Sequence, residues 1–317
     1  MLTSKHLYPS FIKNRGTRFK AFLALGLVCF FWGTTWIASK EGVRHMPALQ
    51  LAGIRQLAGG LLYLVFFMSK GRVWPKGKEW RPILVLSFLN FMLSNALSTW
   101  GVKYISAGLG SIIGATFPLW MVVIGLFSNK KSIPSKAVMG FILGFAGICV
   151  IFYEHLHDFL NAGFLLGIIL SLAATWSWAF GTLYTKQHAK SFNPYFSFGL
   201  QMIISGIIIL TVCEPTNISI PLKNIPWQSW AAIAYLVIFS SVLSFVAYLY
   251  ALQHLSAEQT SIYAYINPVV AVSLGALIFG EKLTIFIALG GIITLLGVYL
   301  INHSLKSHRI EKEIAPV

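Results

Sequence analysis

One charged side chain, Arg55, lies inside a long apolar stretch of this 317-residue chain. It follows Pro47 by eight residues, which is about 12 Å along an ideal helix. A charge at that depth of an apolar segment is costly, and it is a candidate for function. Arginine offers a two-pronged fork of donors to a carboxylate or a phosphate. The alternative is structural: Arg55 bonds backbone carbonyls freed elsewhere or reaches toward Glu41.

The other titratable residues offer little chemistry at such depth. All nine acidic residues and all eight histidines fall at the ends of apolar segments, in connections or in the tails. The chain has no HExxH, no GxSxG and no carboxylate pair within an apolar segment. Its three cysteines lie in or beside apolar stretches and are interpreted as small hydrophobic residues. We therefore predict that the protein is not an enzyme and holds no metal and no cofactor.

Aromatic and polar side chains share several of the apolar segments, and together they suit the wall of a cavity. Asn267 directly precedes Pro268, so its amide is expected to bridge the interrupted backbone or to reach the cavity. For any single aromatic residue, packing against its neighbours is the alternative. The predicted binding residues are Trp32, Thr35, Arg55, Asn95, Thr116, Trp178, Gln201, Tyr248, Tyr263 and Asn267.

The composition places these residues in a membrane. The chain is 56% hydrophobic and only 10% charged, whereas soluble domains carry about 25% charged residues. A helix that spans a bilayer needs roughly 20 apolar residues. We predict an all-α integral membrane protein with ten transmembrane helices at about residues 20–39, 47–68, 82–100, 107–127, 135–153, 162–185, 195–213, 228–252, 258–279 and 284–302.

The net charge of +15 is distributed as a topology signal. Most of the lysines and arginines fall in segments on the same side as the N-terminus. Under the positive-inside rule this asymmetry predicts that both termini are cytoplasmic. The basic excess is therefore no sign of nucleic acid, and the expected partners are anionic membrane lipids and a small molecule.

The chain also repeats itself. With a shift of 150 positions, Pro118 meets Pro268, Gly140 meets Gly290 and Gly147 meets Gly297. Earlier in the chain a shift of 146 matches Trp32 with Trp178 and Arg55 with Gln201. We expect Pro118 and Pro268 to kink a symmetric pair of helices. The repeated glycines are expected to let scaffold helices approach closely.

Each repeat contains five predicted spans. Because five is odd, the second copy must enter the membrane from the opposite side, which gives two inverted repeats around a central cavity. The predicted boundaries are a basic tail at 1–19, a first repeat at 20–153, a second repeat at 162–302 and a second tail at 303–317.

These segments resemble the drug/metabolite transporter superfamily, specifically its EamA-type ten-helix members. The resemblance rests on "FFWGTTWIASK" (30–40), "GIRQLAGGLLYL" (53–64), "SAGLGSIIGATFPLWMVVIGLF" (106–127) and the segment 256–284 with its Gly280-Glu281 pair. It implies ten helices, cytoplasmic termini and transport of small organic metabolites, often export. One departure is visible, because Lys130-Lys131 stand where the second half has Gly280-Glu281.

The leading functional prediction is a secondary transporter, an exporter or permease of small organic metabolites such as amino acids, in the inner or plasma membrane. It is expected to work as a monomer or a homodimer by alternating access. The alternative within the same superfamily is a flippase for lipids or lipid-linked sugars, which needs a groove open sideways to the bilayer. A membrane-embedded enzyme or a receptor is a third class, without supporting motifs.

Overall fold

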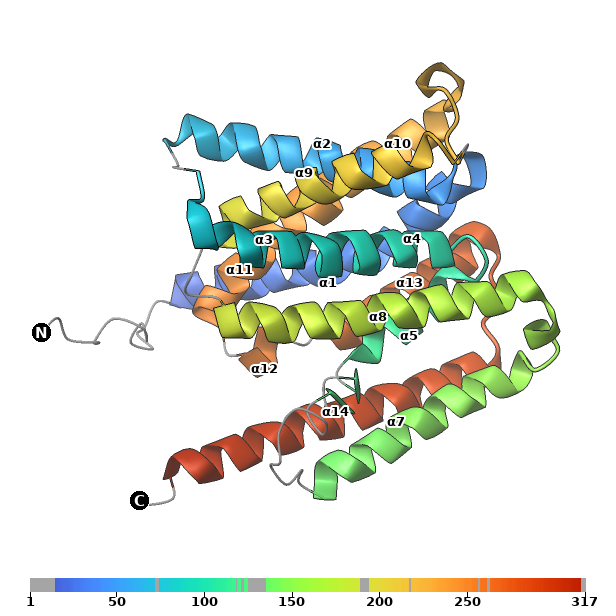
Figure 1. Ribbon diagram of the computed structural model, residues 1–317. Coiled ribbons are helices and arrows are strands. Elements are labelled where there is room, and N and C mark those ends of the chain that lie inside the picture. Colours follow the sequence, from blue (N-terminus) through green and yellow to red (C-terminus); the bar gives the residue numbers. More distant parts are fainter. Residues whose placement is uncertain are drawn as a thin grey trace, which may run out of the picture.

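The computed structural model describes a protein built only of helices (Figure 1) in the part of the chain it covers. The predicted kink at Pro118 and the Lys130-Lys131 pair lie outside the described residues. Residues 15–71, 74–117, 119–120, 123–124, 135–188, 194–216, 218–255, 257–260 and 263–314 are described.

The helices end where the sequence interrupts an apolar stretch. Pro47 separates α1 from α2, and Pro194 begins α9, where its missing N–H costs nothing. Gly280 follows α13 with a positive φ of 64°, a conformation that glycine adopts readily. The elements are α1 Arg15–His45, α2 Ala48–Ser69, η1 Gly77–Glu79, α3 Trp80–Leu86, η2 Ser87–Asn95, α4 Ala96–Gly101, α5 Ala107–Ala115, α7 Ser135–Glu154, η3 Asp158–Leu160, α8 Ala162–His188, α9 Pro194–Cys213, η4 Leu222–Asn224, α10 Trp227–Tyr235, η5 Leu236–Leu243, α11 Ser244–His254, α12 Ala257–Thr260, α13 Tyr263–Phe279 and α14 Ile285–Ile314.

The prediction of an all-α integral membrane protein is confirmed. Among the described residues, 6 helices are long and apolar enough to cross a membrane, and further shorter apolar helices cover 138–154, 263–279 and 285–301. The predicted span at 107–127 is described only in part, through α5 and a few residues after it.

The long helices lie side by side, roughly parallel or antiparallel to one another (Figure 1). α1 begins and α14 ends at the same end of the bundle, which we call the proximal end. The connections α1–α2, α4–α5, α7–α8, α9–α10 and α13–α14 lie at the other end, which we call the distal end.

Helices α7 and α14 pack closely through small residues, and so do α2 and α9. A Cβ added at Gly140 of α7 would lie 2.7 Å from the carbonyl oxygen of Gly297 in α14. A Cβ added at Gly60 of α2 would lie 2.7 Å from the carbonyl oxygen of Gly199 in α9. The close helix approach predicted for the glycines of α7 and α14 is therefore confirmed. Packing of this kind replaces the hydrophobic drive that lipid does not supply.

Two helices change their hydrogen-bond register in mid-course. η2 and η5 are π-helical, and each lies between two α-helical stretches of one continuous helix. At their ends the N–H of Ala96 donates to the carbonyl of Phe91, and the N–H of Ser244 donates to that of Phe239, five residues back. The two stretches occupy matching places in the two sequence repeats. π-Helical turns are rare and are often found at functional sites.

Candidate functional site

A cavity of about 210 Å³ lies among helices of both halves of the chain. The first half contributes α1, α2, η2, α4 and α5, and the second contributes α8, η5, α11 and α13. Seven of the predicted binding residues line it, together with Pro268: Trp32, Thr35, Arg55, Asn95, Trp178, Tyr263 and Asn267. The remaining lining residues were not among the predicted binding residues: Trp36, Ser39, Ser94, Ser98, Thr99, Ser111, Gly114, Ala115, Phe117, Ala174, Thr175, Ser240, Phe245 and Ala264.

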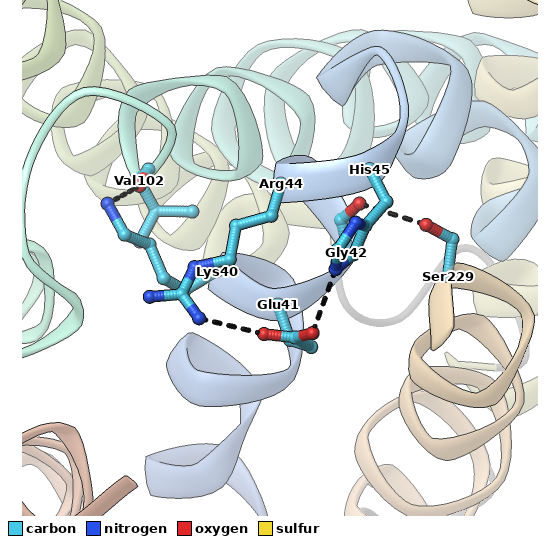
Figure 2. A network of polar contacts seen from close by, with 7 residues as sticks. All are labelled: Lys40, Glu41, Gly42, Arg44, His45, Val102 and Ser229. Carbon is cyan, nitrogen blue, oxygen red and sulfur yellow. Dashed lines mark hydrogen bonds and ion pairs between the residues drawn. The ribbon is translucent and has the colours of Figure 1, made fainter. Parts of the chain in front are cut away.

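Arg55 is the one charged residue among the described residues of this wall. It is only 4% exposed, yet it lines the cavity. Nε donates to the Ser241 hydroxyl at 3.2 Å, and Nη1 donates to the Asn95 amide oxygen at 3.5 Å. Both partners are neutral. Glu41 is not a partner, because it pairs with Arg44 and His45 at 3.1 and 3.0 Å (Figure 2).

Ser240 and Ser241 of η5 connect the second half to the first. The Trp32 indole N–H donates to the Ser240 carbonyl at 3.2 Å, and the hydroxyls of Thr35 and Ser240 share a hydrogen bond of 2.7 Å. The Tyr63 hydroxyl donates to the Ser241 carbonyl at 3.1 Å. In the sequence, these contacts were indicated only by two adjacent serines within an apolar span. That indication is weak, because serine is common at helix contacts in membranes.

Four rings pack together beside the cavity, and we call them the aromatic cluster: Trp32, Phe245, Tyr248 and Tyr263. The Trp32 ring lies 5.3 Å from Phe245, 5.2 Å from Tyr248 and 4.9 Å from Tyr263, centroid to centroid. Such edge-to-face and tilted pairs are favourable beyond their buried area. Tyr248 belongs to this cluster without being part of the cavity wall.

Asn267 and Pro268 lie where α13 passes the cavity. Oriented so that its nitrogen donates, the Asn267 amide bonds the carbonyls of Cys29 and Tyr263 at 2.9 and 3.0 Å. The Tyr263 bond lies within α13 and the Cys29 bond reaches α1. The side chain thus bonds backbone carbonyls of two helices and also lines the cavity.

Two predicted residues lie away from the cavity. Thr116 is fully buried, and its hydroxyl donates to the Ile113 carbonyl at 2.6 Å. Gln201, matched to Arg55 by the repeat, is 2% exposed on α9, and its amide donates to the Ser197 hydroxyl at 2.6 Å. The two repeats therefore do not place matched polar residues at the same site.

At the distal end, two charged side chains hold the α4–α5 connection. Lys40 Nζ donates to the carbonyls of Val102 and Ile105 at 2.9 and 2.6 Å (Figure 2). The Glu281 carboxylate accepts from the N–H groups of Ala107 and Gly108 at 2.7 and 3.2 Å. A carboxylate at a helix N-terminus and an ammonium at a helix C-terminus both complement the helix dipole. This pair fixes where α5 begins, and α5 carries part of the cavity wall.

Helices that cross a membrane around a cavity with polar and aromatic walls are typical of membrane transporters. The comparison with protein families gives the particular group. The model of the EamA-like transporter family matches residues 19–153 and again residues 165–303. The chain therefore belongs to the EamA-like transporter family, and it is an integral membrane transporter.

Known relatives cover nearly the whole chain. The chain is 26% identical over 289 residues to the uncharacterized transporter YvbV of Bacillus subtilis, covering 90% of this chain and 93% of YvbV. It is 30% identical over 275 residues to the uncharacterized inner membrane transporter YedA of Escherichia coli, covering 83% and 84%. A solved structure titled "Crystal structure of protein" shares the fold with a TM-score of 0.62 at 14% identity, covering 90% of this chain and 98% of that one.

Proposed function

We propose that the protein is a secondary carrier of small organic metabolites that works by alternating access between two inverted five-helix repeats. The observation that carries the proposal is the cavity, whose wall draws residues from both halves of the chain. A carrier of this type binds its solute at the interface of the repeats. Two halves that enclose one site can open it by turns to either face of the membrane.

Further features support ten spans in two copies. The family model matches the chain twice, in segments of similar length. The second helix of one predicted copy packs on the second helix of the other, and the fifth packs on the fifth. η2 and η5 place a π-helical stretch in the third helix of each copy. In this proposal the proximal end faces the cytoplasm, because the basic segments gather there, and export is the natural direction.

Arg55 is the proposed recognition residue for an anionic group of the solute. The residue is buried and lines the cavity, and its hydrogen-bond partners among the described residues are neutral. The rings of Trp36 and Trp178 line the same space and suit an apolar part of the solute.

The test is counterflow with the purified full-length protein in liposomes. Vesicles loaded with one unlabelled solute are offered the same solute in labelled form, across a panel of amino acids, organic acids and cationic drugs. A carrier accumulates the label transiently, and protein-free vesicles do not. Arg55→Gln is expected to slow anionic and zwitterionic solutes selectively. If no solute in a broad panel shows counterflow, the carrier assignment is wrong.

A further inference from the structure

The donors of Arg55 are only partly used by the protein. A guanidinium carries five N–H groups and is always charged, and the hydrogen bonds of Arg55 are one from Nε to Ser241 and one from Nη1 to Asn95. Nη2 makes no hydrogen bond to any described residue, although only 4% of the residue is exposed. Arg55 lines the cavity, and a guanidinium with unused N–H groups can bind a carboxylate with two parallel hydrogen bonds.

The charge of Arg55 has no counter-ion in the cavity wall. The sequence places every acidic residue at a helix end, in a connection or in a tail. The two carboxylates at the distal end of α1 and α13 are already engaged, Glu41 with Arg44 and Glu281 with the N-terminus of α5. A buried charge without a partner is unfavourable. A bound anion would supply the missing charge, whereas an ammonium group would meet a like charge and no carboxylate.

The other residues of the cavity wall indicate the size and polarity of the rest of such an anion. Phe117, Trp36 and Trp178 line the cavity, and hydroxyl groups are spread between them. A dry cavity of about 150 Å³ is known to hold a benzene ring, so about 210 Å³ accommodates one ring or a branched alkyl group together with a carboxylate. Larger, multiply charged solutes would leave charges unpaired.

We infer that the solute is an organic monoanion, a carboxylate on a compact aromatic or branched apolar body, and that each crossing moves one net negative charge. The inference rests on the proposed carrier function and narrows its substrate class. Arg55 stays in the bundle throughout the cycle, so the solute alone sets the charge that moves. A membrane potential that is negative inside then drives the anion outward without a coupling ion, by about tenfold in concentration ratio for each 59 mV.

The test compares two solutes that differ by a single ammonium group, 3-phenylpropanoate and L-phenylalanine. Labelled uptake is measured in liposomes containing the full-length protein, with the potential set by potassium gradients and valinomycin. Protein-free liposomes correct for passive crossing of the protonated acid. We expect 3-phenylpropanoate uptake to rise at least fivefold when the interior is made positive instead of negative. Phenylalanine uptake should be at least tenfold slower than 3-phenylpropanoate uptake and should not depend on the membrane potential.

Two variants tie this behaviour to the guanidinium. Arg55→Gln should lower 3-phenylpropanoate uptake at least tenfold, with a thermal unfolding midpoint recorded for each preparation. Arg55→Lys keeps the charge but loses the fork, so it should keep the response to potential with a higher half-saturation concentration. It serves as the readout if Arg55→Gln does not fold.

The outcomes separate the two proposals. If phenylalanine or a cation crosses by counterflow while 3-phenylpropanoate and other carboxylates do not, the carrier stands and the monoanion inference is overturned. If carboxylate uptake does not depend on the membrane potential, the inference that each crossing moves one negative charge is overturned. If nothing crosses at all, the proposed carrier function fails, and the inference fails with it.

Discussion

Trp32 and Trp178 occupy matched positions in the two sequence repeats, and both line the cavity, but their surroundings differ. Trp32 on α1 belongs to the aromatic cluster and donates its indole N–H to the Ser240 carbonyl. Trp178 on α8 makes no ring–ring contact within the described part of the chain, although both tryptophans are partly buried. One copy of the tryptophan packs against three other rings, and the other lines the cavity without such contacts.

Two residues at matched positions of the repeats can therefore have different roles. The α1 side of the cavity is tied to the second half through Ser240 and through the close packing of Gly33 on α13, where an added Cβ would lie 3.2 Å from the Asn267 carbonyl oxygen. The α8 side meets the cavity through Ala174, Thr175 and Trp178. We therefore expect substitutions on α1 to change stability first and substitutions on α8 to change solute binding first.

The largest expected effect separates the two tryptophans by stability. Trp32→Ala should cost about 3 to 5 kcal/mol, the usual range for removing a large aromatic side chain from a packed core. Trp178→Ala should cost less than half of that, because its ring lacks aromatic partners. Thermal and denaturant unfolding of the purified protein in detergent measure both. Equal losses for the two variants would remove the distinction between the two sides.

The next effect concerns solute binding. Trp178→Ala should raise the half-saturation concentration for transport about tenfold, equivalent to about 1.4 kcal/mol, and Trp178→Phe should recover most of it. Trp176, on the same helix, is 47% exposed and packs on Trp120, so Trp176→Ala is the matched control. Transport kinetics in liposomes give the comparison. A Trp176→Ala variant that loses affinity as strongly would place the solute elsewhere.

A smaller effect is expected at the distal end, where Glu281 holds the beginning of α5. Glu281→Gln keeps one acceptor but loses the charge, and it should lower the free energy of unfolding by about 1 kcal/mol. Glu41→Gln is the control, since its ion pairs are exposed and such pairs contribute little. The same unfolding measurements apply. A larger loss from Glu41→Gln would contradict the proposed capping role of Glu281.

The smallest effect tests a single bond on the α1 side. The Thr35–Ser240 hydrogen bond should contribute about 0.6 kcal/mol, the average for such bonds between membrane helices. A double-mutant cycle with Thr35→Val and Ser240→Ala isolates this coupling. A coupling energy of zero would mean that the two hydroxyls are satisfied independently, and α1 would then be held to the second half by its other contacts.

The helix positions were predictable because apolar length and proline placement determine them in a membrane. Arg55 was predictable as a residue of the cavity wall because no other charge lies so deep in an apolar segment. The glycine contacts of α7 with α14 followed from the spacing of small residues. In each case the signal is local in sequence, and the constraint from the bilayer is strong.

Other features depend on three-dimensional neighbours and were not predictable. Whether Gln201 or Arg55 reaches the cavity is decided by how α9 and α2 rotate about their shared glycine contact. The contacts of Ser240 and Ser241 with the first half could be recognised only once the π-helical turn of η5 was seen. Glu281 was noticed as part of a pair, but its partners lie more than 170 positions earlier in the chain.

The π-helical stretches also bear on how this chain tolerates change in length. A π-turn holds one residue more than an α-turn, since its bonds join residues five apart instead of four. Deleting one residue within η2 or η5 can be absorbed locally, as the ladder tightens to the α register. The same deletion in α9 would turn every later side chain of that helix by about 100°. Within the membrane-spanning helices, single-residue insertions and deletions among homologous chains should therefore occur mostly at η2 and η5.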